Sequence, residues 1–152
     1  MSESEPKATS APAETTTARP GVPRWVGLVM IIAGAVFTVV GVVAYIAVQQ
    51  TLSDQKITVS DDASHFGGKA VNGPFTAYAQ AMVIGKHAKE IGGGKTYAEL
   101  PQDDPNRDTV MTASFLQASL FTSVVAFGVS VMAAVLGLLL ILLGWALRRL
   151  AP

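Results

Sequence analysis

The chain alternates between long apolar blocks and polar stretches. The first block runs from Val26 to Val48 and the second from Val124 to Leu147, and neither contains a charged residue. A soluble core disperses its apolar positions at the period of a helix or strand, whereas these blocks are continuous. As a helix, the first block would be about 34 Å long, and a hydrocarbon layer is about 30 Å thick. We therefore predict transmembrane helices over residues 25–48 and 124–147.

A cleaved signal peptide is the alternative for the first block. The apolar region of a signal peptide is only about 7–15 residues long and leads into a cleavage site between small residues. The block that begins at Val26 is longer than this, and no such site follows it. The pattern therefore favours a retained membrane anchor.

The basic residues beside the apolar blocks set the expected orientation. Arg24 precedes the first block, and Arg148 and Arg149 follow the second, whereas Lys56 and Arg107 between the blocks lie further from them. Short flanks rich in arginine and lysine stay in the cytoplasm. A tryptophan stands beside the arginine at each end, where indole rings favour the headgroup layer. We therefore expect both termini in the cytoplasm of a cell-membrane protein.

Residues 1–23 differ in composition from the rest of the chain. They are rich in Ser, Ala, Pro, Thr and Glu and show no apolar period. Such a segment cannot bury enough apolar surface to fold by itself. We expect a disordered cytoplasmic tail there, and a short cytoplasmic end at residues 148–152.

The segment between the spans, residues 49–123, is expected outside the cytoplasm and contains one amphipathic stripe. A helix over about 74–91 is predicted, because proline suits a first helical turn and three glycines follow residue 91. Its apolar residues recur at spacings of three and four and so share one face. They are Phe75, Tyr78, Ala79, Met82 and Val83. Such a stripe either packs on the helix that leads into the second span, or contacts the membrane or a partner.

Shorter signals flank this helix. The run KITVS, residues 56–60, alternates and is rich in β-branched residues, so a short strand is expected there. Thr96 and Glu99 fit a capping box and predict a short helical turn. Asp104 is the expected cap, and Pro105 the expected start, of a stalk helix that continues into the second span. The fold class that follows is an all-α membrane hairpin with a small, mainly helical external loop domain.

Small residues recur every seven positions in both spans. Seven residues turn a helix by about 700°, so each set forms a nearly straight stripe. The sets are Gly27, Gly34 and Gly41 in the first span, and Ser123, Ser130, Gly137 and Gly144 in the second. Small residues allow close backbone approach in lipid and mark helix contact faces. We expect the stripes to face each other within one hairpin; a seam between copies of a homo-oligomer is the alternative.

Composition limits the chemistry that the chain can perform. Its 152 residues include 11 basic and 11 acidic side chains, so no basic excess points to nucleic acid. Cysteine is absent, which excludes disulfides and thiolate metal sites. Neither predicted span contains an acidic or basic side chain. That argues against an ion-coupled transporter or a proton relay, which needs such groups.

Two patterns carry candidate chemistry. The sequence GGGKT at 92–96 is similar to the end of a phosphate-binding loop, but the first glycine of that motif is replaced by Lys89 and a helix precedes it instead of a strand. His65 and His87 are the only histidines, and a non-haem iron site needs two histidines and a carboxylate. The nearby carboxylates are Asp61, Asp62 and Glu90. No motif joins these groups, so we predict no catalytic residue, cofactor or metal site.

Four stretches carry a resemblance to a known family. They are DQKITVSDDA, GPFTAYAQA, GGKTYAEL and ASFLQASLFTSVVAFGVS. With them the chain resembles, from about Trp25 to Leu150, a family of small actinobacterial membrane proteins that often carry the label of an aromatic ring-opening dioxygenase small subunit. The resemblance implies two spans and this type of loop.

Three functions remain open at this point. The first is a non-catalytic membrane protein whose external loop engages another membrane or envelope component, with Phe75, Tyr78, Met82 and Val83 as the candidate partner face. The second is a dioxygenase-type enzyme, which rests on the family label and on His65 and His87. The third is a self-assembling membrane oligomer, which rests on the glycine stripes.

Overall fold

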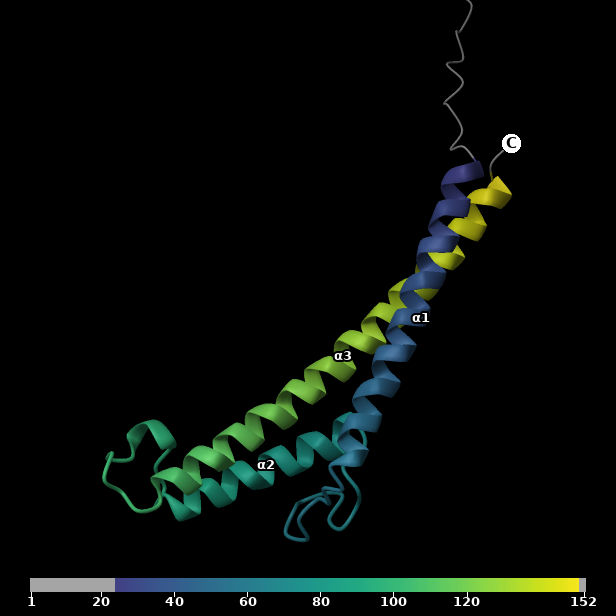
Figure 1. The fold of residues 1–152 in the computed structure, drawn as a ribbon. Coiled ribbons are helices and arrows are strands. Elements are labelled where there is room, and N and C mark those ends of the chain that lie inside the picture. Colours follow the sequence, from purple (N-terminus) through teal and green to yellow (C-terminus); the bar gives the residue numbers. More distant parts are fainter. Residues whose placement is uncertain (1–23, 151–152) are drawn as a thin grey trace, which may run out of the picture.

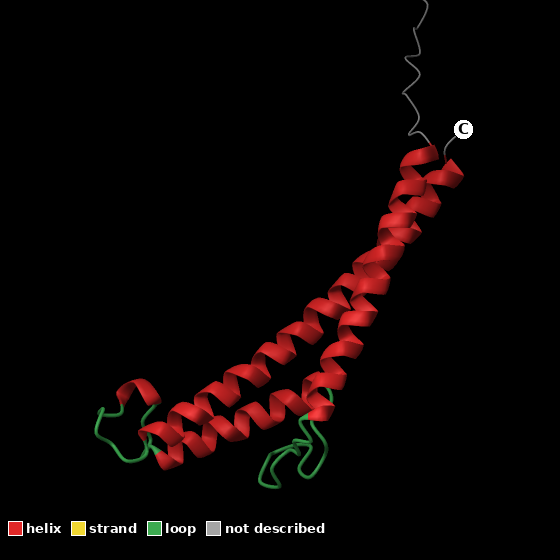
Figure 2. Ribbon diagram, in the orientation of Figure 1, coloured by secondary structure: helices red, strands yellow, loops and turns green. Residues whose placement is uncertain are grey.

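The computed structural model describes residues 24–150. The tail expected at residues 1–23 and the last two residues lie outside this range. Helices make up 76% of the described part, and it contains no strand, which confirms the all-α class. Figure 2 shows that the helices are joined by irregular loops.

Two of the helices are much longer than the others. Helix α1 covers Arg24–Asp54 and helix α3 covers Arg107–Leu150. Both are long and apolar enough to cross a membrane. At 1.5 Å per residue α3 is about 66 Å long, roughly twice the thickness of a hydrocarbon layer. Its first half is therefore free to pack on other parts of the chain.

Helices α1 and α3 run antiparallel and are paired closely at one end (Figure 1). A Cβ atom built on Gly34 would lie 2.5 Å from the carbonyl oxygen of Gly137. A Cβ on Gly27 would lie 2.6 Å from the Gly144 oxygen, and one on Gly41 would lie 2.6 Å from the oxygen of Ser130. The three glycines of α1 thus lie against Gly144, Gly137 and Ser130 of α3 within a single chain.

The close pairing ends where the small residues end. After Gly41 and Ser130, the next layer holds Tyr45 and Phe127, whose ring centroids are 4.8 Å apart. Phe127 is fully buried. The two helices spread apart toward the end of the hairpin that carries α2 (Figure 1). Bulky side chains fill the widening gap between them.

Helix α2, Pro74–Ile91, packs along the first half of α3. Together with the end of α1 and the 55–73 segment it closes the main hydrophobic core of the described chain. The buried members of this core are Leu52, Val59, Val71, Ala77, Ala81, Leu120 and Phe127. A second, smaller cluster joins Ala88 to Leu100 and Val110 at the far end of α2.

The strand expected at residues 56–60 is reduced to one isolated bridge, between Thr58 and Ala70. Val59 donates its N–H to the Lys69 oxygen, and Val71 donates to the Ile57 oxygen, each at 2.8 Å. The ladder stops there because the N–H of Gly68 turns back to the Val59 oxygen. The β-branched run is anchored by burial of its valine and not by a sheet.

The caps before α3 differ in part from the expectation. The 3₁₀ turn η1, Tyr97–Glu99, has the predicted capping box, in which the Thr96 N–H donates to the Glu99 carboxylate at 2.8 Å. This hydrogen bond lowers the pKa of Glu99. Helix α3, however, begins at Arg107 and not at Pro105. The Asp104 carboxylate accepts the Asn106 N–H at 2.8 Å and so forms a turn before the helix.

Candidate functional site

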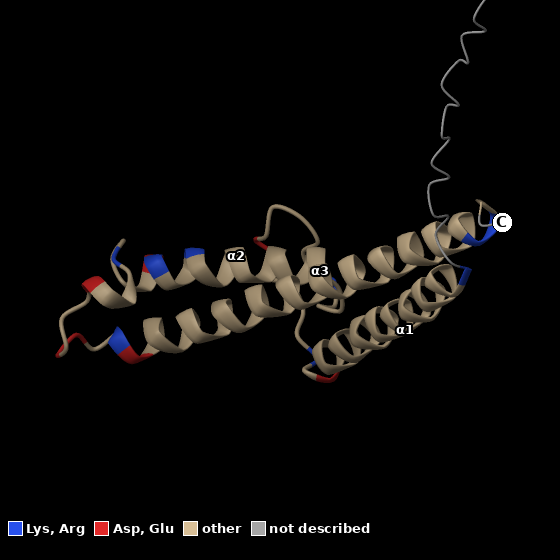
Figure 3. Cartoon of the chain, turned by 90° about the horizontal axis from the view of Figure 1, so that it is seen from above, with Lys and Arg blue, Asp and Glu red and all other residues tan. Residues whose placement is uncertain are grey.

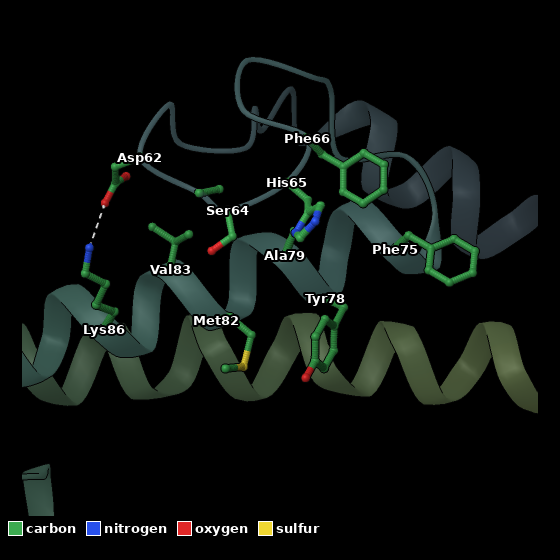
Figure 4. A pocket seen from close by; sticks show the side chains of 11 residues that line it. Asp62, Ser64, His65, Phe66, Phe75, Tyr78, Ala79, Met82, Val83 and Lys86 are labelled. Carbon is green, nitrogen blue, oxygen red and sulfur yellow. Dashed lines mark ion pairs between the residues drawn. The ribbon is translucent and has the colours of Figure 1, made fainter.

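An open groove with a volume of about 620 Å³ lies beside α2. One wall is α2, which contributes Phe75, Tyr78 and Met82 (Figure 4). The other is the 61–68 loop, which contributes Ser64 and Phe66. Ligand pockets in proteins have volumes of about 300–1,000 Å³, so the groove is of a size that can receive a ligand or a partner's side chains.

A face of small residues on α2 places its large side chains in the groove. Ala77 and Ala81 are 0% exposed and lie in the main core, to which α3 contributes Leu120 and Phe127. At Gly85, one turn further on, a Cβ would collide with the Gln117 side chain of α3. Because α2 approaches α3 through alanine and glycine, its bulkier face is turned aside.

The apolar stripe of α2 is consequently only partly buried. Phe75 is 74% exposed, Tyr78 51% and Met82 50%. Val83, by contrast, is 6% exposed and forms part of the groove lining next to the loop. The stripe was expected either to pack inside the protein or to face outward. In the structure its Val83 edge is covered, whereas its Phe75, Tyr78 and Met82 edge is exposed.

The base of the 61–68 loop is firmly fixed. The Ser60 N–H donates to the Gln80 side chain of α2 at 2.9 Å, and Gln80 is itself buried. Val59 and Val71, which flank the loop, are each 1% exposed. Gly68 has a φ of 71°, a conformation that glycine adopts without strain. The loop therefore leaves and re-enters the core at defined points.

A carboxylate also holds the loop to α2. Asp62 Oδ2 lies 2.7 Å from His87 Nε2 and 3.5 Å from Lys86 Nζ on α2. The hydrogen bond from His87 is the main cause of the lowered pKa of Asp62. Lys86 also lies 3.9 Å from Glu90. Asp62, Lys86 and His87 form a latch at one end of an otherwise largely apolar groove. Figure 4 shows its Asp62–Lys86 ion pair.

The opposite end of the groove lies close to the long apolar block of α3. Tyr78 packs edge-on against Phe121 of α3, with ring centroids 5.8 Å apart. Phe121 precedes by three residues the block predicted to begin at Val124. Since α2 and α3 run antiparallel, Phe75 lies further along toward that block. The groove thus extends from a charged latch to the start of the apolar block.

The histidines are in different settings. His87 is paired with Asp62, whereas the His65 ring lies 6.4 Å from the Phe66 ring at the loop tip. Among residues 24–150, no three His, Cys, Asp or Glu side chains are grouped closely enough to hold a metal ion. The structure does not bring together the set that an iron site would require.

The GGGKT segment at 92–96 ends α2. Gly93 and Gly94 have φ values of 62° and 87°, and the Gly94 N–H donates to the Lys89 oxygen at 2.7 Å. These are the hydrogen bonds of a helix C-terminus. The segment reverses the chain between α2 and η1.

The loop side of the groove was not predicted from the sequence. Ser64 and Phe66 carry no local signal, because they meet α2 only through the tertiary fold. The packing face of α2 did have a signal. Ala77, Ala81 and Gly85 recur at spacings of four, which is a small-residue contact pattern like those of the spans.

The described residues therefore define an all-α hairpin of apolar helices with a groove beside its connecting segment. Comparison of the chain with protein-family models, with curated proteins and with solved structures finds no match.

Proposed function

We propose that the chain is a two-span protein of the cell membrane, with its ends in the cytoplasm and residues 49–123 outside. In the most apolar window of each long helix, only 17% of residues are buried within the chain. The core helix of a soluble protein is mostly buried, so this exposure supports a lipid environment. The arginines at the paired end support a cytoplasmic location for it.

The proposed function is to engage another membrane or envelope component through the groove, without catalysis. The observation that carries it is the exposed aromatic edge of α2, where Phe75, Tyr78 and Met82 border a hollow of about 620 Å³. Large exposed apolar patches mark interaction sites, and aromatic anchors contribute much of the binding energy at interfaces. The family resemblance stays a prediction and is compatible with this function.

The two alternatives receive no comparable support. A dioxygenase-type site would draw on His65 and His87, which have different neighbours in the structure. Self-assembly through the glycine stripes would need those stripes free, and in the structure they face each other within one chain.

Site-specific photocross-linking in native membranes tests the proposal. A photoreactive phenylalanine analogue at Met82 would lie in the groove, and the same group at Phe115 would lie outside it, on an α3 side chain that is 66% exposed. We expect a discrete cross-linked product from position 82 and none from position 115. No product at 82, or the same products at both positions, would refute a dedicated groove partner.

A further inference from the structure

The paired end of the hairpin carries only positive charge on its two helices. Helix α1 begins at Arg24, and α3 ends with Arg148 and Arg149, so antiparallel pairing gathers all three (Figure 3). The acidic residues of the same helices, Asp54 and Asp108, lie at the opposite ends.

The glycine pairing at this end determines where the arginines lie. A Cβ on Gly27 would be 2.6 Å from Cγ of Arg148, so the Arg148 stem crosses over α1 at that glycine. Arg149 takes another direction, with its guanidinium carbon 3.9 Å from the centroid of the Trp145 ring. The Arg148 stem therefore lies at the junction of the two helices, and the Arg149 guanidinium lies over Trp145 of the same helix.

The surrounding side chains fit a lipid headgroup. Trp25 is 65% exposed and Trp145 51% exposed, and indole rings favour the headgroup layer of a membrane. Guanidinium groups bind phosphate in a bidentate manner, and they retain their charge at any physiological pH. Basic sites between transmembrane helices on the cytoplasmic side bind anionic headgroups.

We propose that this end of the hairpin binds the phosphate group of an anionic phospholipid, with Arg148 and Arg149 as the principal ligands. The indole rings then pack against the glycerol region of the same layer. The inference rests on the membrane placement proposed above, but it is independent of the groove and of any groove partner.

Quenching of tryptophan fluorescence tests the site, because the only two tryptophans of the chain, Trp25 and Trp145, both stand here. The full-length protein is reconstituted into phosphatidylcholine bilayers that contain a small fraction of brominated lipid. We expect brominated phosphatidylglycerol to quench more strongly than brominated phosphatidylcholine at the same mole fraction. Equal quenching by the two lipids would overturn the proposal.

Charge variants decide whether the arginines cause the preference. Since each basic residue near an anionic surface contributes about fivefold, Arg148→Gln with Arg149→Gln should reduce the preference by roughly tenfold or more. The matched control, Lys56→Gln with Lys69→Gln, removes two charges from the connecting segment and should leave the preference unchanged. Replacement of both arginines by lysine keeps the charge but loses bidentate binding, so the preference should fall to an intermediate level.

Two further outcomes would overturn the inference. A preference that survives in the double glutamine variant would place the anionic lipid elsewhere, and a full preference in the lysine variant would reduce it to diffuse charge attraction. Flotation of the reconstituted protein with vesicles after an alkaline wash tests membrane insertion separately. If the protein does not float, both the proposed membrane placement and the lipid site are wrong. If the protein is inserted but the two brominated lipids quench equally, only the lipid site is wrong.

Discussion

Asp62 is the residue on which the outer wall of the groove depends. The base of the 61–68 loop is fixed by the buried valines and by Gln80, whereas its tip meets α2 through Asp62. The two partners, Lys86 and His87, are adjacent on α2 and approach the same carboxylate oxygen. Exposed ion pairs contribute little to global stability, so the consequence of losing this one is local.

Replacing Asp62 by alanine should free the loop tip and leave the hairpin intact. Hydrogen exchange at residues 61–66 is expected to become several-fold faster, because local opening no longer breaks the latch, while exchange in α1 and α3 stays unchanged. Asp61→Ala is the matched control, since Asp61 makes no ion pair with α2 in the described chain. Equal effects of the two variants would show that the carboxylate of Asp62 does not hold the loop.

Acid should have the same effect as the substitution. The pKa of Asp62 is lowered in the fold, so its contribution to stability is present at neutral pH and is lost as the pH falls through that lowered pKa, below the ordinary value of 3.8. The protection of the loop amides in the native protein, which is the intrinsic exchange rate at each pH divided by the observed rate, should therefore fall in that range. The Asp62→Ala variant should not show this fall in protection.

At the scale of helices, the close contact between α1 and α3, which we call the seam, depends on glycine residues that have no side chain. A Cβ on Gly137 would lie 2.5 Å from both the Gly34 oxygen and the Thr38 nitrogen, and it would also collide with the Thr38 hydroxyl. These atoms belong mostly to the backbone and cannot move aside without separating the helices. Gly128, on the same helix, has no neighbouring atom within 4 Å of such a Cβ.

Gly137→Ile should therefore destabilise the hairpin, whereas Gly128→Ile should not. Overpacking a close contact costs about 1–3 kcal/mol, and a branched side chain against backbone belongs at the upper end of that range. The measurement is loss of helical circular dichroism of the purified protein on titration with a denaturing detergent. Equal curves for the two variants would contradict the seam. If Gly137→Ile abolished an oligomer but left the unfolding curve unchanged, the glycine stripe would instead form contacts between copies of the chain.

The sequence predicts these helices well because their signals are local. A long uncharged run identifies α1 and α3, and the period of Phe75, Tyr78 and Met82, bounded by Pro74 and three glycines, places α2 at 74–91. Which face of α2 packs on α3 is harder to predict from the sequence. The largest apolar side chains are expected inside, yet alanine and glycine allow a closer approach to α3 and leave the larger residues at the edge.

The groove itself could not be predicted from the sequence. Its outer wall requires the 61–68 loop to fold back on α2, through contacts such as Asp62 with His87 that join residues far apart in the chain. The strand expected at 56–60 shows the same limit. Its alternating pattern reports burial of Val59, but a sheet needs a partner strand, and Gly68 turns the chain away after a single bridge.

At the scale of the whole molecule, the change from small to bulky side chains between α1 and α3 determines how far apart the two helices lie. Small residues pair α1 with α3 as far as Gly41 and Ser130, and then Tyr45 and Phe127 separate them. The opened end is where the first half of α3 receives α2 and the loop, and so carries the groove (Figure 1). The closed end carries the arginines. The two candidate sites therefore lie at opposite ends of the hairpin.

If the long helices cross the membrane, these two ends must lie on opposite sides of it. Single cysteines at Ser64, in the groove, and at Thr15, outside the described residues, can report this in intact cells with a membrane-impermeant maleimide. The native chain contains no cysteine, so it adds no background. We expect labelling at position 64 alone, since arginine-rich flanks remain in the cytoplasm, and labelling of both positions after the membrane is permeabilised.

Labelling at position 15 alone would contradict this topology and place the groove in the cytoplasm. His65, His87 and Asp62 would then face cytoplasmic small molecules, and the dioxygenase-type alternative would call for metal analysis of the purified protein. Labelling of both positions in intact cells would contradict a two-span hairpin altogether. Labelling at position 64 alone would direct the search for the groove partner to membrane and envelope components on the outer side of the membrane.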